Sequence, residues 1–165
     1  MRNMFVAIVS VVLLIGGVGI VGQSKSGSVQ GVWQTAEIRI TGPTPRTITV
    51  PRPGPYVTIF TAKHYSRTEV QSEGPRQILP DIAKATADEL RAVWGPVVAE
   101  AGTYEVSGDT LTVHPTASKS PAAMAAGAFI VYSYKLDGDT LSITQVRNQT
   151  GPFPNPFTVK MARIE

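Results

Sequence analysis

Hydrophobic and polar residues alternate along much of the chain after position 30, which is the period of a half-buried β-strand. Residues 31–40 show this pattern first, with Trp33 as the large side chain expected to point inward. Two further runs, 56–61 and 65–70, are rich in aromatic and β-branched residues and predict a hairpin. A last run, 157–164, predicts a closing strand. The pattern therefore predicts a sheet built from consecutive antiparallel strands.

The clearest part of this pattern is a repeat, at residues 104–113 and 134–143. Each copy starts with tyrosine and contains Gly-Asp-Thr-Leu, so each predicts a strand, a tight turn and a returning strand. Ser107-Gly108 and Asp137-Gly138 are expected in the turns, because glycine adopts the positive φ that two-residue hairpin loops require. This register pairs Tyr104 with Leu111, Val106 with Asp109, Tyr134 with Leu141 and Leu136 with Asp139.

Between these regions the period changes from that of a strand to that of a helix. Thr86 followed by Glu89 matches a capping box, and Pro96 is expected to end the helix. The sequence predicts one helix over about 86–95, with its apolar face packed against the sheet through Leu90 and Trp94. Apolar residues recur at helical spacing at Leu90, Val93, Trp94 and Val97.

Residues 42–55 are rich in proline, which lacks the N–H donor that a central strand needs. We interpret them as a stiff surface loop or sheet edge; the alternative is a proline-rich recognition motif. In total, about eight strands and one short helix follow one another with short connections. Because closure removes the unpaired edges of such a meander, we predict an all-β fold, an antiparallel up-and-down β-barrel.

The first 22 residues differ from the rest of the chain. A short positive start precedes an uncharged apolar run from Phe5 to Val21, and small and polar residues follow it. This layout predicts a signal peptide over 1–22, although the run is also near the lower limit for a membrane anchor. The barrel domain is then 23–165, and we expect it to be exported, either periplasmic or secreted, or held at the membrane by an uncleaved anchor.

Composition excludes several classes of function. The chain has no cysteine, so disulfides, thiol chemistry and a lipidated cysteine are excluded. The formal charge of +3 is small and scattered, which gives no support for nucleic acid as a partner. The two histidines lie on no metal-binding spacing, and no glycine-rich phosphate loop is present, so no metal and no cofactor is expected. The sequence does not indicate an oligomeric state.

Several short motifs follow one another in a recognisable order along residues 31–165. They are Gly31-Val32-Trp33, a short helix, Gly102-Thr103-Tyr104, Gly108-Asp109, His114, Ser118 and the second Tyr…Gly-Asp-Thr-Leu hairpin, 134–141. In this order and spacing, more than in any one motif, most of residues 31–165 resemble the bacterial lipocalin-like domain family. The resemblance implies a lipocalin-like barrel.

The hairpin register places several apolar residues and tyrosines on one face, where Glu100 would continue the row. Such a face suits a pocket for a small, largely apolar ligand, but the same residues could instead fill the core. An inward Glu100 would have a raised pKa and could act as an acid or base in a barrel enzyme, or orient a polar ligand head. We favour the simpler interpretation, that the strand has not begun there and Glu100 is solvated. The ligand-binding candidates are Trp33, Glu100, Tyr104, Leu111, His114, Tyr132, Tyr134 and Ile143, and no catalytic residue is assigned.

Three functions follow from these patterns. The first is a noncatalytic binder of a small apolar molecule, with a cavity lined by Trp33, Tyr104, Leu111, Tyr132 and Tyr134. The second is a barrel enzyme acting on an apolar substrate, which needs Glu100 inside and within hydrogen-bonding reach of a tyrosine or histidine. The third is an envelope-associated interaction module that uses residues 42–55 as its contact surface.

Overall fold

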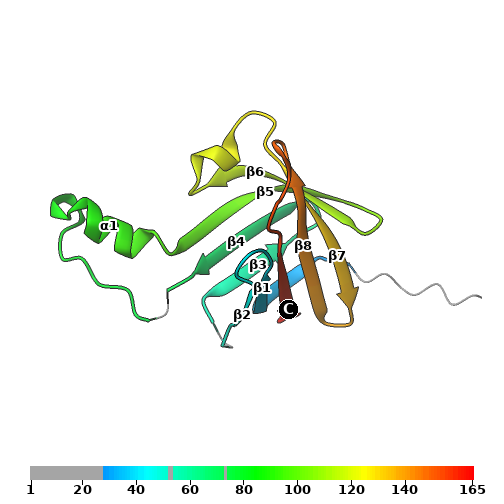
Figure 1. The fold of residues 1–165 in the computed structure, drawn as a ribbon, viewed down its shortest axis with the longest axis horizontal. Helices are drawn as coiled ribbons and strands as arrows, with labels where there is room; N and C mark the ends of the chain where they lie inside the picture. The colour runs from blue at the N-terminus through cyan, green and yellow to red at the C-terminus, as the bar shows by residue number, and fades with distance from the viewer. Residues whose placement is uncertain (1–27, 52–53, 73) are drawn as a thin grey trace, which may run out of the picture.

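The structure, a computed structural model, describes residues 28–51, 54–72 and 74–165 (Figure 1). The strands are β1 (Gly31–Ile40), β2 (Arg46–Thr49), β3 (Tyr56–Phe60), β4 (His64–Val70), β5 (Val97–Ser107), β6 (Thr110–Ser118), β7 (Ile130–Asp137), β8 (Thr140–Asn148), β9 (Gly151–Pro152) and β10 (Phe157–Arg163). The helices are α1 (Ala87–Trp94) and two 3₁₀ turns, η1 (Ile82–Lys84) and η2 (Pro121–Met124).

Eight of these strands close into an antiparallel barrel. The neighbours around the ring are β1, β3, β4, β5, β6, β7, β8 and β10, and β10 pairs with both β8 and β1. Strand β2 pairs with the second half of β1, and β9 pairs with the end of β8. Each ring strand therefore has a partner on both sides, as closure requires. This confirms the predicted all-β, antiparallel up-and-down barrel with one short helix.

The two repeated hairpins form as predicted, but their turns lie one residue further along the chain. Gly108 and Gly138 are the first residues of the two-residue loops, with φ of 60° and 55°. The pairs are therefore Tyr104 with Val113 and Tyr134 with Ile143, which corrects the predicted partners. Each partner moves by two positions, and a shift of two returns a side chain to the same face of a strand. The prediction of which side chains of the hairpins share a face is therefore still correct.

The end of the barrel at these turns is filled by side chains, and we call it the closed end. Trp33, Leu111, Leu141 and Met161 are its largest fully buried apolar residues. The Trp33 Nε1 donates to the Val29 carbonyl at 2.8 Å, and the Arg163 guanidinium lies 4.1 Å from the centre of the Trp33 ring system. Leu111 and Leu141 occupy equivalent positions of the two repeats, so the repeat builds this part of the core.

Helix α1 begins and ends close to where the sequence predicts, but it does not pack against the sheet. Thr86 and Glu89 form the predicted capping box. No residue of the helix is buried, and Trp94 is 49% exposed. Figure 1 shows α1 projecting away from the barrel on the chain that joins β4 to β5. The predicted packing of Leu90 and Trp94 is therefore wrong; Lys119 instead holds the helix end, donating to the carbonyls of Trp94, Gly95 and Val97.

The proline-rich segment is part of the barrel wall as well as a loop. Residues 46–49 form β2, an edge strand, and Val50 is buried beside it. Proline flanks this strand but does not enter its ladder, which fits the positions that proline tolerates in sheets. The predicted signal peptide or anchor, 1–22, lies outside the described residues. Within the described ranges, none of the helices combines the length and apolar character needed to cross a bilayer.

Candidate functional site

The barrel is hollow at the end opposite the closed end, and we call this the open end. A cavity of about 920 Å³ opens there, bounded by the ends of β1 and β4, the starts of β5, β7 and β10, and strand β2. Ligand pockets are typically 300–1,000 Å³ and mostly apolar, with a few convergent polar groups. The wall is apolar in this sense, with Ile38, Ile48, Val50, Val98, Ile130 and Phe157 among its residues.

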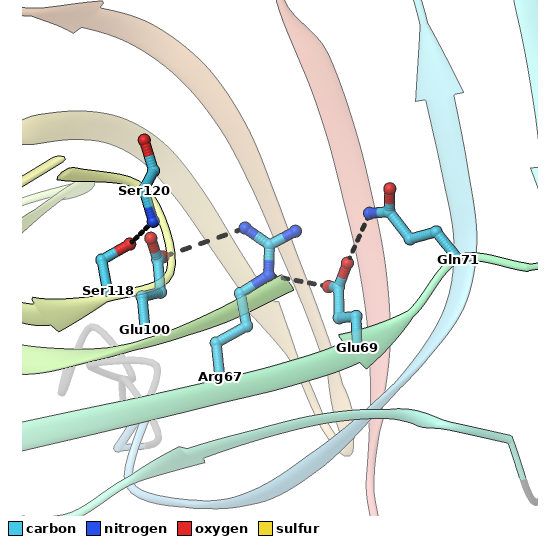
Figure 2. Close-up of polar contacts among 6 residues, drawn as sticks. All are labelled: Arg67, Glu69, Gln71, Glu100, Ser118 and Ser120. Atoms are coloured by element: carbon cyan, nitrogen blue, oxygen red, sulfur yellow. Dashed lines mark hydrogen bonds and ion pairs between the residues drawn. The ribbon is translucent and has the colours of Figure 1, made fainter. Parts of the chain in front are cut away.

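The inner end of the cavity is polar because of strand β4. Tyr65, Arg67 and Glu69 alternate along this strand and so share its inner face. The Arg67 Nε donates to Glu69 Oε1 at 2.7 Å, and the Gln71 Nε2 donates to Glu69 Oε2 at 2.8 Å (Figure 2). The side chain of Glu69 is 1% exposed and that of Arg67 is 17% exposed. A buried carboxylate is thus held by donors on both of its oxygens.

Glu100 completes this polar cluster from the neighbouring strand. It lies directly opposite Arg67 in the pairing of β4 with β5, and Figure 2 shows Arg67 between the two carboxylates. Arg67 Nη1 and Glu100 Oε1 are 4.0 Å apart, which is an ion pair but too long for a hydrogen bond. Burial raises the pKa of the Glu100 carboxyl; Arg67 opposes this shift and Glu69 adds to it.

Two tyrosines extend the cluster toward the closed end. A small inner cavity of about 20 Å³, large enough for one water, lies among Tyr65, Arg67, Glu100, Leu111 and Tyr132. Burial raises the pKa of Tyr132 to about 12, against the lowering effect of Arg67. Burial also raises the pKa of Tyr65, whose hydroxyl is buried and has no hydrogen-bond partner among the described residues. Arg67, Glu100, Tyr132 and Val159 line both cavities, and we call the three polar residues among them, Arg67, Glu100 and Tyr132, the floor of the open cavity.

Four of the eight predicted site residues come together at these cavities. Glu100 and Tyr132 line both, and Leu111 and Ile143 line the small inner cavity. The interpretation that Glu100 is solvated is wrong, since β5 already begins at Val97 and carries Glu100 inward with 12% of its side chain exposed. The inward alternative that the sequence left open is the correct one.

The other four predicted residues line neither cavity. Trp33 fills the closed end, and Tyr134 packs against the core there. Tyr104 packs edge-on against Phe60 and donates its hydroxyl to the Thr61 carbonyl at 2.6 Å. His114 lies opposite Thr103, which is exposed on the outer face of β5. The open cavity therefore includes Glu100 and Tyr132 but does not run through Trp33, Tyr104, His114 or Tyr134.

Sequence reasoning missed the most unusual pair in the barrel, Arg67 and Glu69. A signal was available, because Tyr65 marks the inner face of its strand and residues 67 and 69 share that face. It was weak, since the opposite face carries Ser66 and Thr68 and so is polar as well. The wall contributed by Ile48 and Val50 was also missed, because prolines surround it.

The cluster holds no metal-binding group among the described residues, and Glu100 has no direct hydrogen bond to a tyrosine or histidine there. In the described part of the chain, no three histidine, aspartate or glutamate side chains are grouped so that they could hold a metal ion. The carboxylate of Glu100 makes no hydrogen bond to a tyrosine or histidine of the described residues. Its position inside the barrel meets the first requirement of the enzyme hypothesis, and Tyr65 and Tyr132 line the same small inner cavity as Glu100 without a direct hydrogen bond to it.

Comparison with known proteins assigns no family to the chain: no protein-family model matches it, and no curated protein is significantly similar. A solved structure of an uncharacterized protein from Bacteroides eggerthii DSM 20697 aligns with 81% of this chain and 98% of that chain. The sequence identity is 9% and the TM-score is 0.44. The resemblance to the bacterial lipocalin-like family stays a prediction, and function is argued from the cavity itself.

Proposed function

We propose that this protein is a noncatalytic binder of a small, largely apolar molecule, held in the open cavity with its polar end at the floor. The observation that carries the proposal is the cavity of about 920 Å³ with an apolar wall and a small polar floor. Burying apolar surface against such a wall stabilises a complex by about 25 cal/mol per Å². Arg67, Glu100 and Tyr132 supply the few polar groups that orient a ligand.

The closed ring of strands supports this function because it leaves the wall rigid. Strands paired on both sides keep the wall residues in place before a ligand arrives, so little ordering is needed on binding. Strand β2 and the residues around it complete the mouth with Ile48, Val50 and Pro51. The predicted export of the domain would place such a binder outside the cytoplasm, and it forms part of the proposal.

The test is binding of N-phenyl-1-naphthylamine, an uncharged apolar dye whose fluorescence rises on burial. Val98 lines the cavity, whereas Thr103 lies on the outer face of the same strand. We expect Val98→Trp to fill part of the cavity and weaken dye binding at least about tenfold. Thr103→Trp is the matched control and should bind like the wild type. A wild-type protein that does not bind the dye, or a Val98→Trp variant that binds it unchanged, would overturn the proposal.

A further inference from the structure

Two carboxylates flank the guanidinium of Arg67, and they are not equivalent: Glu100 belongs to the cavity floor, whereas Glu69 lies behind it in the small inner cavity. Arg67 donates to Glu69 at 2.7 Å and Gln71 donates to the other Glu69 oxygen at 2.8 Å. Both oxygens of Glu69 are therefore occupied by donors of the protein itself. Glu69 lines the small inner cavity but not the open one, so it does not face the space that a ligand would fill.

Glu100 is in the opposite situation. It lines the open cavity, its nearest cation is the same Arg67 at 4.0 Å, and it makes no hydrogen bond to a described residue. The Glu100 carboxylate is largely shielded from solvent, with 12% of its side chain exposed, and a donor supplied by a ligand would compensate it better than the long ion pair alone. The floor therefore has unused hydrogen-bond acceptors that point to where a ligand would end.

The charges of the floor also disfavour an anionic ligand. Arg67 is already paired with Glu69 and Glu100. A ligand carboxylate would therefore be the third carboxylate beside one guanidinium. Like charges brought together in a poorly solvated site cost several kcal/mol in affinity. The other cation of the lining, Arg46 on β2, is exposed at the rim, where solvent screens it.

We propose that Glu100 selects the head group of the ligand: it accepts a hydrogen bond from a donor, an amine or a hydroxyl, and excludes carboxylates. This inference rests on the proposed binding function and adds the chemical class of the ligand. An apolar chain fills the wall of the cavity, and its donor end meets the Glu100 carboxylate beside Arg67. The charge of Glu100 thus selects the head group, and the volume of the open cavity limits the size of the apolar chain.

The experiment displaces N-phenyl-1-naphthylamine with three ligands that share one chain length: n-decylammonium, 1-decanol and decanoate. At pH 7.5 the wild type should bind n-decylammonium at least about tenfold more tightly than decanoate. 1-Decanol, which offers a donor without a charge, should also displace the dye. Equal or tighter binding of decanoate than of n-decylammonium overturns the head-group assignment, and this comparison needs no variant.

Glu100→Gln then tests the residue itself, because glutamine keeps the size and removes the charge. The preference for n-decylammonium over decanoate should fall at least about tenfold, whereas 1-decanol affinity should change less than about threefold. Glu105→Gln, an exposed residue of the same strand, is the control and should keep the wild-type preference. An unchanged preference in Glu100→Gln overturns the role of Glu100 alone. A wild-type protein that binds no dye overturns the binding function, and this inference with it.

Discussion

The Arg67 Nε donates to the Glu69 Oε1 at 2.7 Å inside the barrel, from a position two residues earlier on the same strand. Residues two apart on a strand share a face, so the fold sets both side chains side by side. Glu69 is almost fully buried, and its charge depends on Arg67 for compensation. Removing one partner of a buried pair is far more costly than the net value of the pair, because the remaining charge stays buried.

We therefore predict that Arg67→Met lowers the free energy of unfolding by about 3 kcal/mol, measured by urea denaturation. Arg39→Met is the matched control, because Arg39 pairs with Glu37 on the surface at 3.3 Å. Surface pairs contribute about 0–1 kcal/mol, so the control should change little. The double variant Arg67→Met with Glu69→Leu should be more stable than Arg67→Met alone. A double variant that is less stable than the single one would contradict this account of the pair.

The sequence predicted the barrel because its strongest signals are local. Alternation sets which face of a strand is buried, and the glycine of each repeat sets where the chain turns. The turn lies one residue from the predicted place, since Gly108 is the first residue of its loop and not the second. The faces were still correct, because partners displaced by two keep their face. Fold class therefore tolerates a register error that would change individual contacts.

The site was harder to predict because it depends on which end of the barrel interior is left unfilled by side chains. Tyr132 was placed on the inner face by its register, and an inward Glu100 was only the alternative to the solvated position that we favoured. Alternation also gives no information about where along the barrel axis a residue lies. Trp33 and Tyr134 share the inner face and lie at the closed end, away from the cavity. Arg67 was missed because a charged residue inside a barrel contradicts the pattern that identifies the inside.

Glu100 should make stability depend on pH in a recognisable direction. Its pKa is raised above the ordinary value of 4.5, so the folded state keeps this proton to a higher pH than the unfolded state. The free energy of unfolding then falls as the pH rises from about 4.5 through the folded pKa. Glutamine does not titrate, so Glu100→Gln should gain stability relative to wild type over this window. Urea denaturation at several pH values measures the difference.

Glu89 gives a comparison of the opposite sign. The backbone N–H and hydroxyl of Thr86 lower the pKa of its carboxyl, so this interaction is present above pH 4.5 and is lost as the pH falls through the folded pKa. Glu89→Gln should therefore lose stability relative to wild type as the pH rises from the lowered pKa of folded Glu89 to about 4.5. If both variants shifted in the same direction with pH, the assignment for Glu100 would be wrong.

Three glycines should respond to alanine in a graded order. A Cβ at Gly102 would lie 2.0 Å from the His114 carbonyl oxygen, so Gly102→Ala forces two strands apart and should cost at least about 2 kcal/mol. Gly108 has open space but a φ of 60°, and Gly108→Ala should cost about 1 kcal/mol. Gly74 has open space and no left-handed backbone, so Gly74→Ala should change stability by less than about 1 kcal/mol. Urea denaturation gives the order, and a Gly102→Ala variant as stable as Gly74→Ala would refute the close approach of β5 and β6.

The two tryptophans should differ sharply in their contribution to stability. Trp33 is fully buried among the core residues of the closed end, and Trp33→Ala should lower the free energy of unfolding by about 3–5 kcal/mol. Trp94 is 49% exposed on a helix with no buried residue, so Trp94→Ala should cost less than about 1 kcal/mol. Fluorescence adds an independent readout: in the Trp33→Ala variant the remaining tryptophan should be readily quenched by acrylamide, and in Trp94→Ala it should be protected. Equal losses of stability would mean that α1 packs on the barrel, as the hydrophobic pattern of the helix had predicted.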